Sequence, residues 1–402
     1  MTSKDTNNKI DIKISTSDDH KIKERNDEVI TIAYAISITS CPNATKDQKI
    51  SDGAAILKHS IHLSSLKSKN SRYTYEMIAI IHPTAMTCAK DLSSLGYKIL
   101  ERDTPIQIHK IQSQVLREGI VRSGCCQEKE LIKLWAYTLT SYPVVVHLDL
   151  DTLVLQPMDE LFDAMIYGSS KDVPVMFNKA LPLKINAYFT RDYNMARPGK
   201  PHVGVQGGFF IVRPNTTVFQ EYIDTIYTSR FIMGKGWGGK GFGNFYGAQQ
   251  IQGLLPYYYD FLHPNEAVEL NRCYYNAMGD NPRVKTTDGS LGKCKDTNTL
   301  QCEDCRDTPF DKIKSVHFTL CQKPWMCRYS TIDKKWRDYC NFMHHSWFRV
   351  RKSLEEGWKE EFGFRGGRKG DYRVDHFYGF CTFAGVRGYL PLVLPKELGG
   401  VD

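Results

Sequence analysis

Two aspartates stand two residues apart at the end of a largely apolar run. Asp149 and Asp151 follow the sequence VVVHL, residues 144–148. Such a run is typical of a strand buried on both faces of a parallel sheet, and two carboxylates at its end are costly to desolvate unless a positive charge lies between them. A divalent cation that prefers hard oxygen ligands, Mg²⁺ or Mn²⁺, would satisfy both carboxylates. A polar strand end that begins a turn is the alternative interpretation of so short a motif.

The residues around the aspartates extend this pattern. The stretch VHLDLDTLVL, residues 146–155, is followed by PMDELF, residues 157–162, and together they resemble glycosyltransferase family 8, the glycogenin-like nucleotide-sugar hexosyltransferases. In that family the motif follows a strand in the same way, and its aspartates hold Mn²⁺ against the diphosphate of a nucleotide sugar. The resemblance implies that Asp149 and Asp151 are metal ligands and that Leu150 lies at the bound donor.

Two further segments resemble the same family in the same order along the chain. Lys133 stands in a pattern L-x-K-L-x-x-Y, like the family lysine that lies at the donor sugar and phosphate. The segment VHFTLCQKPW, residues 316–325, resembles the family pattern H-F-x-G-x-x-K-P-W. The resemblance implies that His317 is the third metal ligand and that Lys323 contacts the pyrophosphate.

The sugar site is implied by two glutamine-containing segments. QGGFFIVRP, residues 206–214, resembles the family segment that shapes this site and so assigns Gln206, Gly207 and Gly208 to it. Gln249 and Gln250 stand where the family has an aspartate-containing pattern near the reacting sugar carbon. An amide there could orient the sugar or stabilise an oxocarbenium-like centre, but it could not act as a carboxylate nucleophile.

The end of the first predicted strand carries hydroxyl side chains. Ser37 and Thr39 resemble the family segment that contacts the base and ribose, although serine and threonine at a strand end are also common turn residues.

The residue types agree with this function on chemical grounds. Departure of a nucleoside diphosphate builds negative charge on its oxygens, which a metal ion and lysines stabilise. A set of two aspartates and a histidine fits Mn²⁺ better than Mg²⁺, because imidazole is a softer ligand than oxygen. Together with the resemblance, which implies a UDP-sugar donor and retention of anomeric configuration, these residues lead us to expect a metal-dependent retaining glycosyltransferase that moves a hexosyl group from a UDP-sugar to a hydroxyl of a sugar, glycan or protein acceptor. Because the matched segments offer no paired carboxylates for a covalent intermediate, a front-side displacement is favoured.

Two other functions stay open. A catalytically inactive nucleotide-sugar-binding protein is suggested by Leu320, which replaces a family glycine, and by the missing aspartate near Gln249. A cysteine-rich zinc or disulfide interaction module is suggested by seven of the twelve cysteines, which fall within 68 positions at 273, 294, 302, 305, 321, 327 and 340. Disulfides would fit an oxidising lumen, whereas free thiols, or zinc at Cys302 and Cys305 with Cys294, would fit a reducing one.

The elements that must position these residues alternate between strand-like and helix-like patterns from Val29 onward, which predicts an α/β fold with a mixed, mostly parallel sheet flanked by helices. The resemblance implies the GT-A type of nucleotide-diphospho-sugar transferase fold. Strands are predicted at 29–39, 77–81, 97–100, 144–148, 207–213 and 313–319, with helices at 53–68, 127–141 and from 215 to about 229. We expect a disordered leader at 1–28, a catalytic domain at 29–325 with a cysteine-rich insertion at about 270–312, and an aromatic and basic C-terminal extension at 326–402 packed on the domain.

Charge and hydropathy exclude two classes of protein. A net charge of +8 over 402 residues is too dilute to indicate nucleic-acid binding, although Arg328 to Arg373, with 12 basic and 7 acidic residues, suggests a basic surface. No apolar run approaches the roughly 18 residues of a membrane-spanning helix. The polar leader lacks the apolar centre of a signal peptide, which favours the cytoplasm, whereas the cysteine cluster favours a secretory lumen. The oligomeric state is left open.

Overall fold

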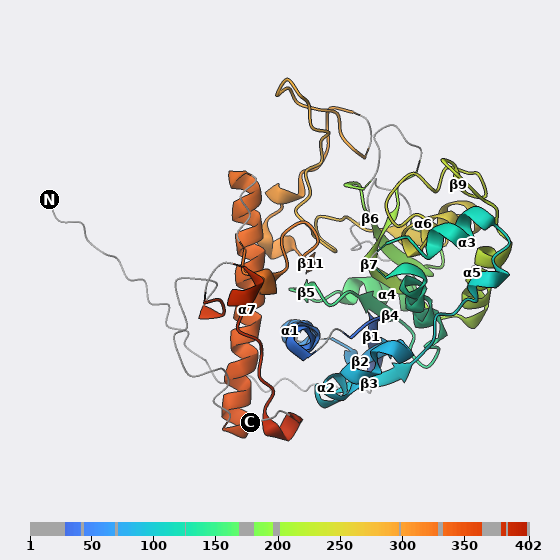
Figure 1. Ribbon diagram of the computed structural model, residues 1–402. Coiled ribbons are helices and arrows are strands. Elements are labelled where there is room, and N and C mark those ends of the chain that lie inside the picture. Colours follow the sequence, from blue (N-terminus) through green and yellow to red (C-terminus); the bar gives the residue numbers. More distant parts are fainter. Residues whose placement is uncertain are drawn as a thin grey trace, which may run out of the picture.

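The computed structural model places a central sheet between two layers of helices (Figure 1). The predicted leader, residues 1–28, lies outside the described residues. The structure describes residues 29–41, 44–68, 71–124, 126–168, 181–195, 202–296, 299–328, 333–363, 379–382 and 385–399.

The main sheet has seven strands in the order β10-β6-β7-β4-β1-β2-β3. Every neighbouring pair is parallel except the two that β7 makes with β4 and β6, so the predicted mixed, mostly parallel sheet is confirmed. The strands are β1 (Ile30–Ile38), β2 (Tyr73–Ile81), β3 (Tyr97–Glu101), β4 (Val145–Leu148), β6 (Ala187–Arg191), β7 (Val205–Val212) and β10 (Ala267–Glu269). Two short ribbons lie outside it: β5 (Thr152–Val154) with β11 (Ser315–His317), and β8 (Phe231–Ile232) with β9 (Gly236–Trp237).

The register of three strands brings the predicted site residues to one edge of the sheet. β1 and β4 are parallel with Ala35 opposite His147, so their carboxyl ends lie side by side. β7 is antiparallel to β4, and its first residues therefore lie beside the end of β4, where the Asp149 amide donates to the Gly208 carbonyl at 2.9 Å. Ligands of open α/β sheets bind outside the carboxyl ends of such strands.

Helices cover both faces of the sheet (Figure 1). One core cluster joins strand side chains to α1 (Ala44–Lys67) and α4 (Asp159–Tyr167), and a second joins the other face to the helices around α5 and α6. The remaining helices are α2 (Ala89–Ser94), α3 (Gln114–Ile120), α5 (Thr216–Thr228), α6 (Ile251–Pro256), a π-helix (Tyr257–Leu262), and 3₁₀ helices that include η1 (Pro83–Cys88) and η3 (Gln127–Thr138).

The segment predicted as a helix at 127–141 is the 3₁₀ helix η3 rather than an α-helix. Side chains three residues apart eclipse in a 3₁₀ helix. This geometry places Glu130 directly against Lys133, with 2.6 Å between Glu130 Oε1 and Lys133 Nζ. The local conformation therefore gives Lys133 a carboxylate partner within its own helix, in addition to its contacts at the strand ends.

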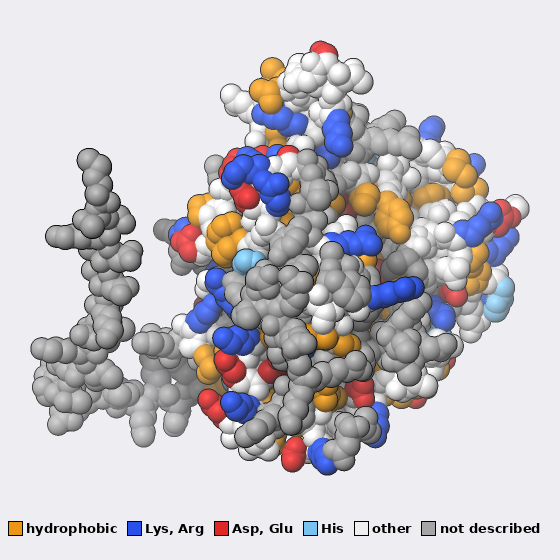
Figure 2. All heavy atoms as spheres, turned by 60° about the vertical axis from the view of Figure 1, so that its left-hand side comes forward, with side chains coloured by type: hydrophobic (Ala, Val, Ile, Leu, Met, Phe, Trp, Pro, Cys, Tyr) orange, Lys and Arg blue, Asp and Glu red, His pale blue; other side chains and the backbone are white. Residues whose placement is uncertain are grey.

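The C-terminal part of the chain forms a long helix, α7 (Lys334–Phe362), that packs on β5, β11 and α1. Its buried face includes Trp347 and the fully buried Arg351, whose guanidinium bonds Glu355 and the Tyr389 hydroxyl. Along α7 several other cations also have acidic partners, and Figure 2 shows Lys and Arg side chains interspersed with Asp and Glu on this face. The described part of this segment, residues 333–363, is thus mixed in charge, and residues 364–373 of the predicted basic stretch lie outside the described residues. Among the described residues, no helix is both long and apolar enough to cross a bilayer.

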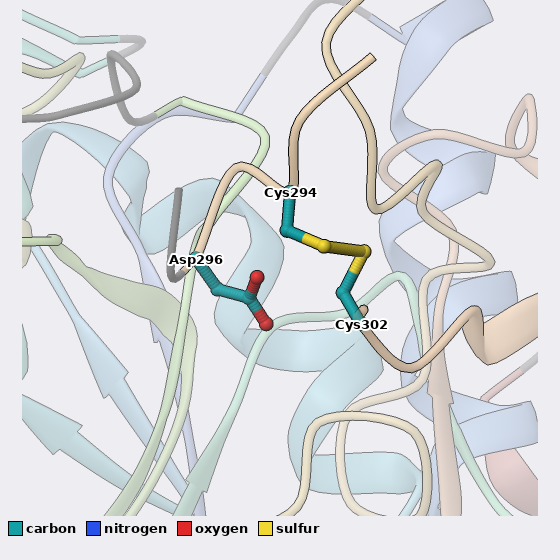
Figure 3. A group of neighbouring side chains, drawn as sticks. All are labelled: Cys294, Asp296 and Cys302. Atoms are coloured by element: carbon teal, nitrogen blue, oxygen red, sulfur yellow. A yellow bond between two sulfur atoms is a disulfide. The ribbon is translucent and has the colours of Figure 1, made fainter. Parts of the chain in front are cut away.

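Disulfides account for all seven clustered cysteines. The pairs are Cys41–Cys88, Cys273–Cys305, Cys294–Cys302, Cys321–Cys340 and Cys327–Cys381. Figure 3 shows Cys294 and Cys302 joined beside Asp296. The zinc and free-thiol interpretations are therefore wrong for this cluster, because a sulfur engaged in a disulfide offers no thiolate to a metal. Five disulfides are typical of proteins that fold under oxidising conditions.

Candidate metal and donor site

The two aspartates and the histidine meet at the junction of the main sheet and the small ribbon. Asp149 and Asp151 lie between β4 and β5, and β5 pairs with β11 so that Thr152 stands opposite His317. His317 Nε2 is 3.3 Å from Asp151 Oδ1. One ligand atom of each residue lies within 4.8 Å of the others, which is the span that a single cation bridges with bonds of about 2–2.5 Å.

The space beside these ligands depends on Gly208. A Cβ at this position would lie 2.4 Å from His317 Cε1 and 2.7 Å from Asp149 Oδ2. Only glycine leaves room for both side chains to face one point, so the residues present fit a metal ion of the Mn²⁺ type, held by two carboxylates and an imidazole.

Gly208→Ala is expected to disrupt this arrangement. We expect the Mn²⁺ concentration needed for half-maximal metal-dependent activity to rise at least about tenfold, and the free energy of unfolding to fall by about 1–3 kcal/mol because the added methyl overpacks the site. Gly357→Ala, on the exposed side of the helix at residues 334–362, is the control, since an added Cβ there would meet no heavy atom within 4 Å. Titration with Mn²⁺ and thermal melting check both values, and equal behaviour of the two variants would contradict the role of Gly208.

Lys133 is a buried cation on the first aspartate. Its ammonium lies 2.9 Å from Asp149 Oδ1 and donates to the Gly207 carbonyl at 3.0 Å. Burial opposes the charge of Lys133, but Asp149 and Glu130 outweigh it and raise the pKa of Lys133 above its ordinary value. Burial likewise disfavours the ionised form of Asp149, yet the charge of Lys133 holds the pKa of Asp149 below its usual range. Both groups are therefore charged at neutral pH.

Lys323 is the second cation, and it lies on the other aspartate. Its ammonium contacts Asp151 Oδ2, while the Lys323 side chain is 46% exposed. Burial disfavours the ionised form of Asp151, but the charges and hydrogen bonds of His317 and Lys323 outweigh it and lower the pKa of Asp151. Lys323 is therefore both charged and accessible from solvent. A side chain that binds the diphosphate of an incoming ligand needs both properties.

The glutamines predicted for the sugar site divide into two places. Gln206 lies on β7, and its Oε1 accepts from the Gly208 amide at 2.6 Å, so it braces the strand beside Asp149. The amides of Gln249 and Gln250 donate to the carbonyls of Val115 and Ser123, at 3.4 and 2.8 Å. Gln249 thus bonds α3 and Gln250 bonds the segment that follows it, and their part in sugar binding stays a prediction.

The hydroxyl residues lie at the end of β1. Ser37 Oγ is 2.8 Å from Nε2 of His147, a buried residue of β4. Burial, with Lys133 nearby, lowers the pKa of His147 to about 3, so this histidine is neutral at physiological pH. Thr39 follows the strand and is partly exposed, and Leu150 packs close to Gly53 of α1. The contacts predicted for Ser37, Thr39 and Leu150 with a nucleotide stay predictions.

Three residues of the site were missed from the sequence. Glu130 pairs with Lys133, Gln252 packs beside Gly207, and Asn276 bonds His317. Gln252 lies in the same segment, QQIQ at 249–252, as Gln249. The sequence therefore pointed to the correct segment but not to the residue of it that lies beside Gly207. Asn276 belongs to the cysteine-rich insertion, which carried no family resemblance.

No protein-family model matches the chain, and no curated protein matches its sequence. Several solved structures do match its fold. The bifunctional glycosyltransferase WbbM is 14% identical at a TM-score of 0.41, and covers 85% of this chain, which spans 52% of WbbM. Mouse xyloside xylosyltransferase 1 is 13% identical at a TM-score of 0.41, and the match covers 73% of this chain and 99% of the xylosyltransferase chain. The galactosyltransferase LgtC is 11% identical at a TM-score of 0.40, and the match covers 83% of this chain and 100% of LgtC. These are glycosyltransferases, the class that the motifs resemble.

Proposed function

We propose that the protein is a metal-dependent retaining glycosyltransferase that moves a hexosyl group from a UDP-sugar to an acceptor hydroxyl. The observation that carries the proposal is the convergence of Asp149, Asp151 and His317 within 4.8 Å, with the ammonium groups of Lys133 and Lys323 on the two carboxylates. These residues come from segments far apart in the chain. Their convergence is what a site for a metal and a diphosphate requires.

The charge balance of the site supports a diphosphate ligand. Without a metal, three carboxylates (Glu130, Asp149 and Asp151) face two ammonium groups (Lys133 and Lys323). A bound dication reverses this balance and favours an anionic group at the same place. When bound, the metal would act as a Lewis acid that stabilises charge on the leaving diphosphate.

The chain's own residues divide the remaining tasks. Lys323 is free enough to turn from Asp151 toward phosphate oxygens, where an ammonium stabilises charge that builds up as the sugar leaves. Lys133 is fixed by Glu130 and the Gly207 carbonyl, and so holds Asp149 in one orientation. Retention by front-side displacement fits a site whose bound acceptor and leaving group share one face of the sugar, so that a departing phosphate oxygen can take the acceptor proton.

A donor panel tests the proposal. Purified protein is incubated with several UDP-hexoses and either Mn²⁺, Mg²⁺ or a chelator, and released UDP is measured. We expect release from one donor, greater with Mn²⁺ than with Mg²⁺ and absent with the chelator. Metal-dependent UDP binding without release from any donor would instead establish the inactive nucleotide-sugar-binding protein, and neither binding nor release would contradict both functions.

A further inference from the structure

The metal-facing histidine is held by a residue of the cysteine-rich insertion. His317 Nδ1 is 3.1 Å from Asn276 Oδ1, and the Asn276 Nδ2 donates to Thr190 Oγ1 at 2.9 Å. His317 is 3% exposed and Asn276 is fully buried, so water does not compete for these contacts. The three side chains form a line from β6 through the insertion to β11.

This contact determines which nitrogen of His317 can bind a metal. An amide oxygen accepts hydrogen bonds and cannot donate, so Nδ1 of His317 must carry the proton that Asn276 accepts. Nε2, which lies 3.3 Å from Asp151 Oδ1, is then the nitrogen that can give up its proton and bind a metal. A hydrogen bond to the far nitrogen fixes both the tautomer and the ring orientation of a metal-binding histidine.

Asn276 is itself held against the strand of His317. Its backbone amide donates to Ser315 Oγ at 3.0 Å, the next residue, Ala277, donates to the Ser315 carbonyl at 2.8 Å, and the His317 amide donates to the Ala277 carbonyl at 3.0 Å. Asn276 has a φ of +63°, a left-handed conformation that asparagine adopts more readily than most residues.

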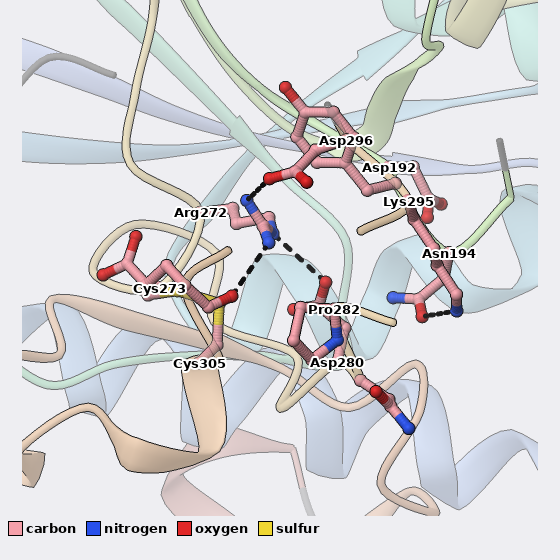
Figure 4. Close-up of polar contacts among 12 residues, drawn as sticks. Asp192, Asn194, Arg272, Cys273, Asp280, Pro282, Lys295, Asp296 and Cys305 are labelled. Carbon is pink, nitrogen blue, oxygen red and sulfur yellow. Dashed lines mark hydrogen bonds and ion pairs between the residues drawn. A yellow bond between two sulfur atoms is a disulfide. The ribbon is translucent and has the colours of Figure 1, made fainter. Parts of the chain in front are cut away.

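The turn that carries Asn276 is closed on both sides. Arg272 Nε lies 3.1 Å from Asp280 Oδ2 (Figure 4), and both side chains are almost fully buried. The adjoining Cys273 is joined to Cys305, and the Arg272 guanidinium also donates to the Glu303 carbonyl at 3.3 Å. The insertion therefore fixes the position of Asn276 from outside the strands that carry the metal ligands.

We propose that Asn276 is a positioning residue for the metal ligand His317, and that the Cys273–Cys305 disulfide maintains it, so the cysteine-rich insertion is part of the metal site. This inference rests on the proposed function, since it concerns the metal of that site. The inference goes beyond the proposed function because it gives the cysteine-rich insertion a direct role, which is to position the metal ligand His317.

The test is the Mn²⁺ dissociation constant of the full-length protein, measured without nucleotide from the EPR signal of the free ion. Asn276→Gly removes the acceptor and suits the positive φ, and we expect Mn²⁺ binding to weaken about 10- to 100-fold. Asn276→Asp keeps an acceptor oxygen for His317, and we expect its dissociation constant to stay within about threefold of wild type. Thr190→Val, which removes only the far hydroxyl, is the control for disturbance of the network.

Wild-type affinity in Asn276→Gly, or equal weakening in the Gly and Asp variants, would overturn the inference while leaving the proposed function intact. Absence of Mn²⁺ binding by the wild type would instead overturn the proposed function and this inference together.

A pair of disulfide variants tests the role of the insertion by the same measurement. Replacing Cys273 and Cys305 by serine is expected to weaken Mn²⁺ binding about tenfold, by analogy with loss of an outer-shell partner. Replacing Cys294 and Cys302, which lie in the same insertion but do not close the Asn276 turn, is expected to change it less than threefold. Thermal melting confirms that each variant is folded. If the two folded double variants bound Mn²⁺ with equal affinity, the Cys273–Cys305 disulfide would have no role in positioning Asn276.

Discussion

Asp151→Asn is expected to reduce metal-dependent UDP release by about 10³-fold or more. The substitution keeps the size of the side chain but removes the charge that His317 and Lys323 share. Loss of a charged ligand takes several kcal/mol from the stabilisation of a leaving diphosphate, and each 1.36 kcal/mol is a factor of ten in rate. Initial rates of UDP release at saturating Mn²⁺ and donor provide the measurement.

Asp338→Asn is the control for this variant. Asp338 lies on α7, its side chain is 53% exposed, and it pairs with Lys334 rather than with a residue of the site. We expect wild-type rates from it, because exposed ion pairs contribute little. If Asp151→Asn kept more than about a tenth of the wild-type rate at saturating Mn²⁺, Asp151 would not be a ligand of a metal that the reaction needs.

Lys323→Met is expected to lower turnover by about 10²- to 10³-fold, the usual cost of removing one group that stabilises charge in a transition state. The same change should leave Mn²⁺ binding unchanged or tighter. The Lys323 ammonium contacts the Asp151 carboxylate that would also hold the metal, so it competes with the ion for that group. Measuring kcat and the Mn²⁺ dissociation constant on one preparation separates the two effects.

The control for Lys323 is Lys312→Met, which replaces an exposed lysine shortly before β11 and should change neither quantity. Lys323→Arg keeps a positive charge and should fall between wild type and Lys323→Met. Weaker Mn²⁺ binding together with normal turnover in Lys323→Met would show that Lys323 supports the metal ligands rather than the diphosphate.

The parts of the site that were predicted from the sequence are those encoded locally. The run VVVHL predicts a buried strand, and the aspartates that follow it must then lie at a strand end. His317 and Lys323 could be predicted because both lie in one short segment, residues 316–325, whose spacing matches the pattern H-F-x-G-x-x-K-P-W. The mostly parallel sheet followed from alternation of strand and helix patterns, which depends on neighbours in sequence.

The parts that were missed depend on contacts between distant segments. Asn276 meets His317 across 41 residues of chain, and nothing in its own neighbourhood marks it. Disulfide pairing among many cysteines cannot be deduced from spacing alone. The long helix α7 was missed because tryptophan and other aromatic residues have only moderate helix propensity, although Trp336, Met343 and Trp347 recur at spacings that a helix would place on one side.

The central claim is that one metal ion joins this chain to the diphosphate of a nucleotide sugar. It is tested most directly by electron–nuclear double resonance of Mn²⁺ bound to the protein with UDP. We predict one Mn²⁺ per chain, with hyperfine coupling to ³¹P of UDP and to one histidine ¹⁴N, the latter lost in His317→Ala. Mn²⁺ coupled to ³¹P without any ¹⁴N coupling in the wild-type protein would contradict the account, because the ion would then be bound elsewhere than at Asp149, Asp151 and His317.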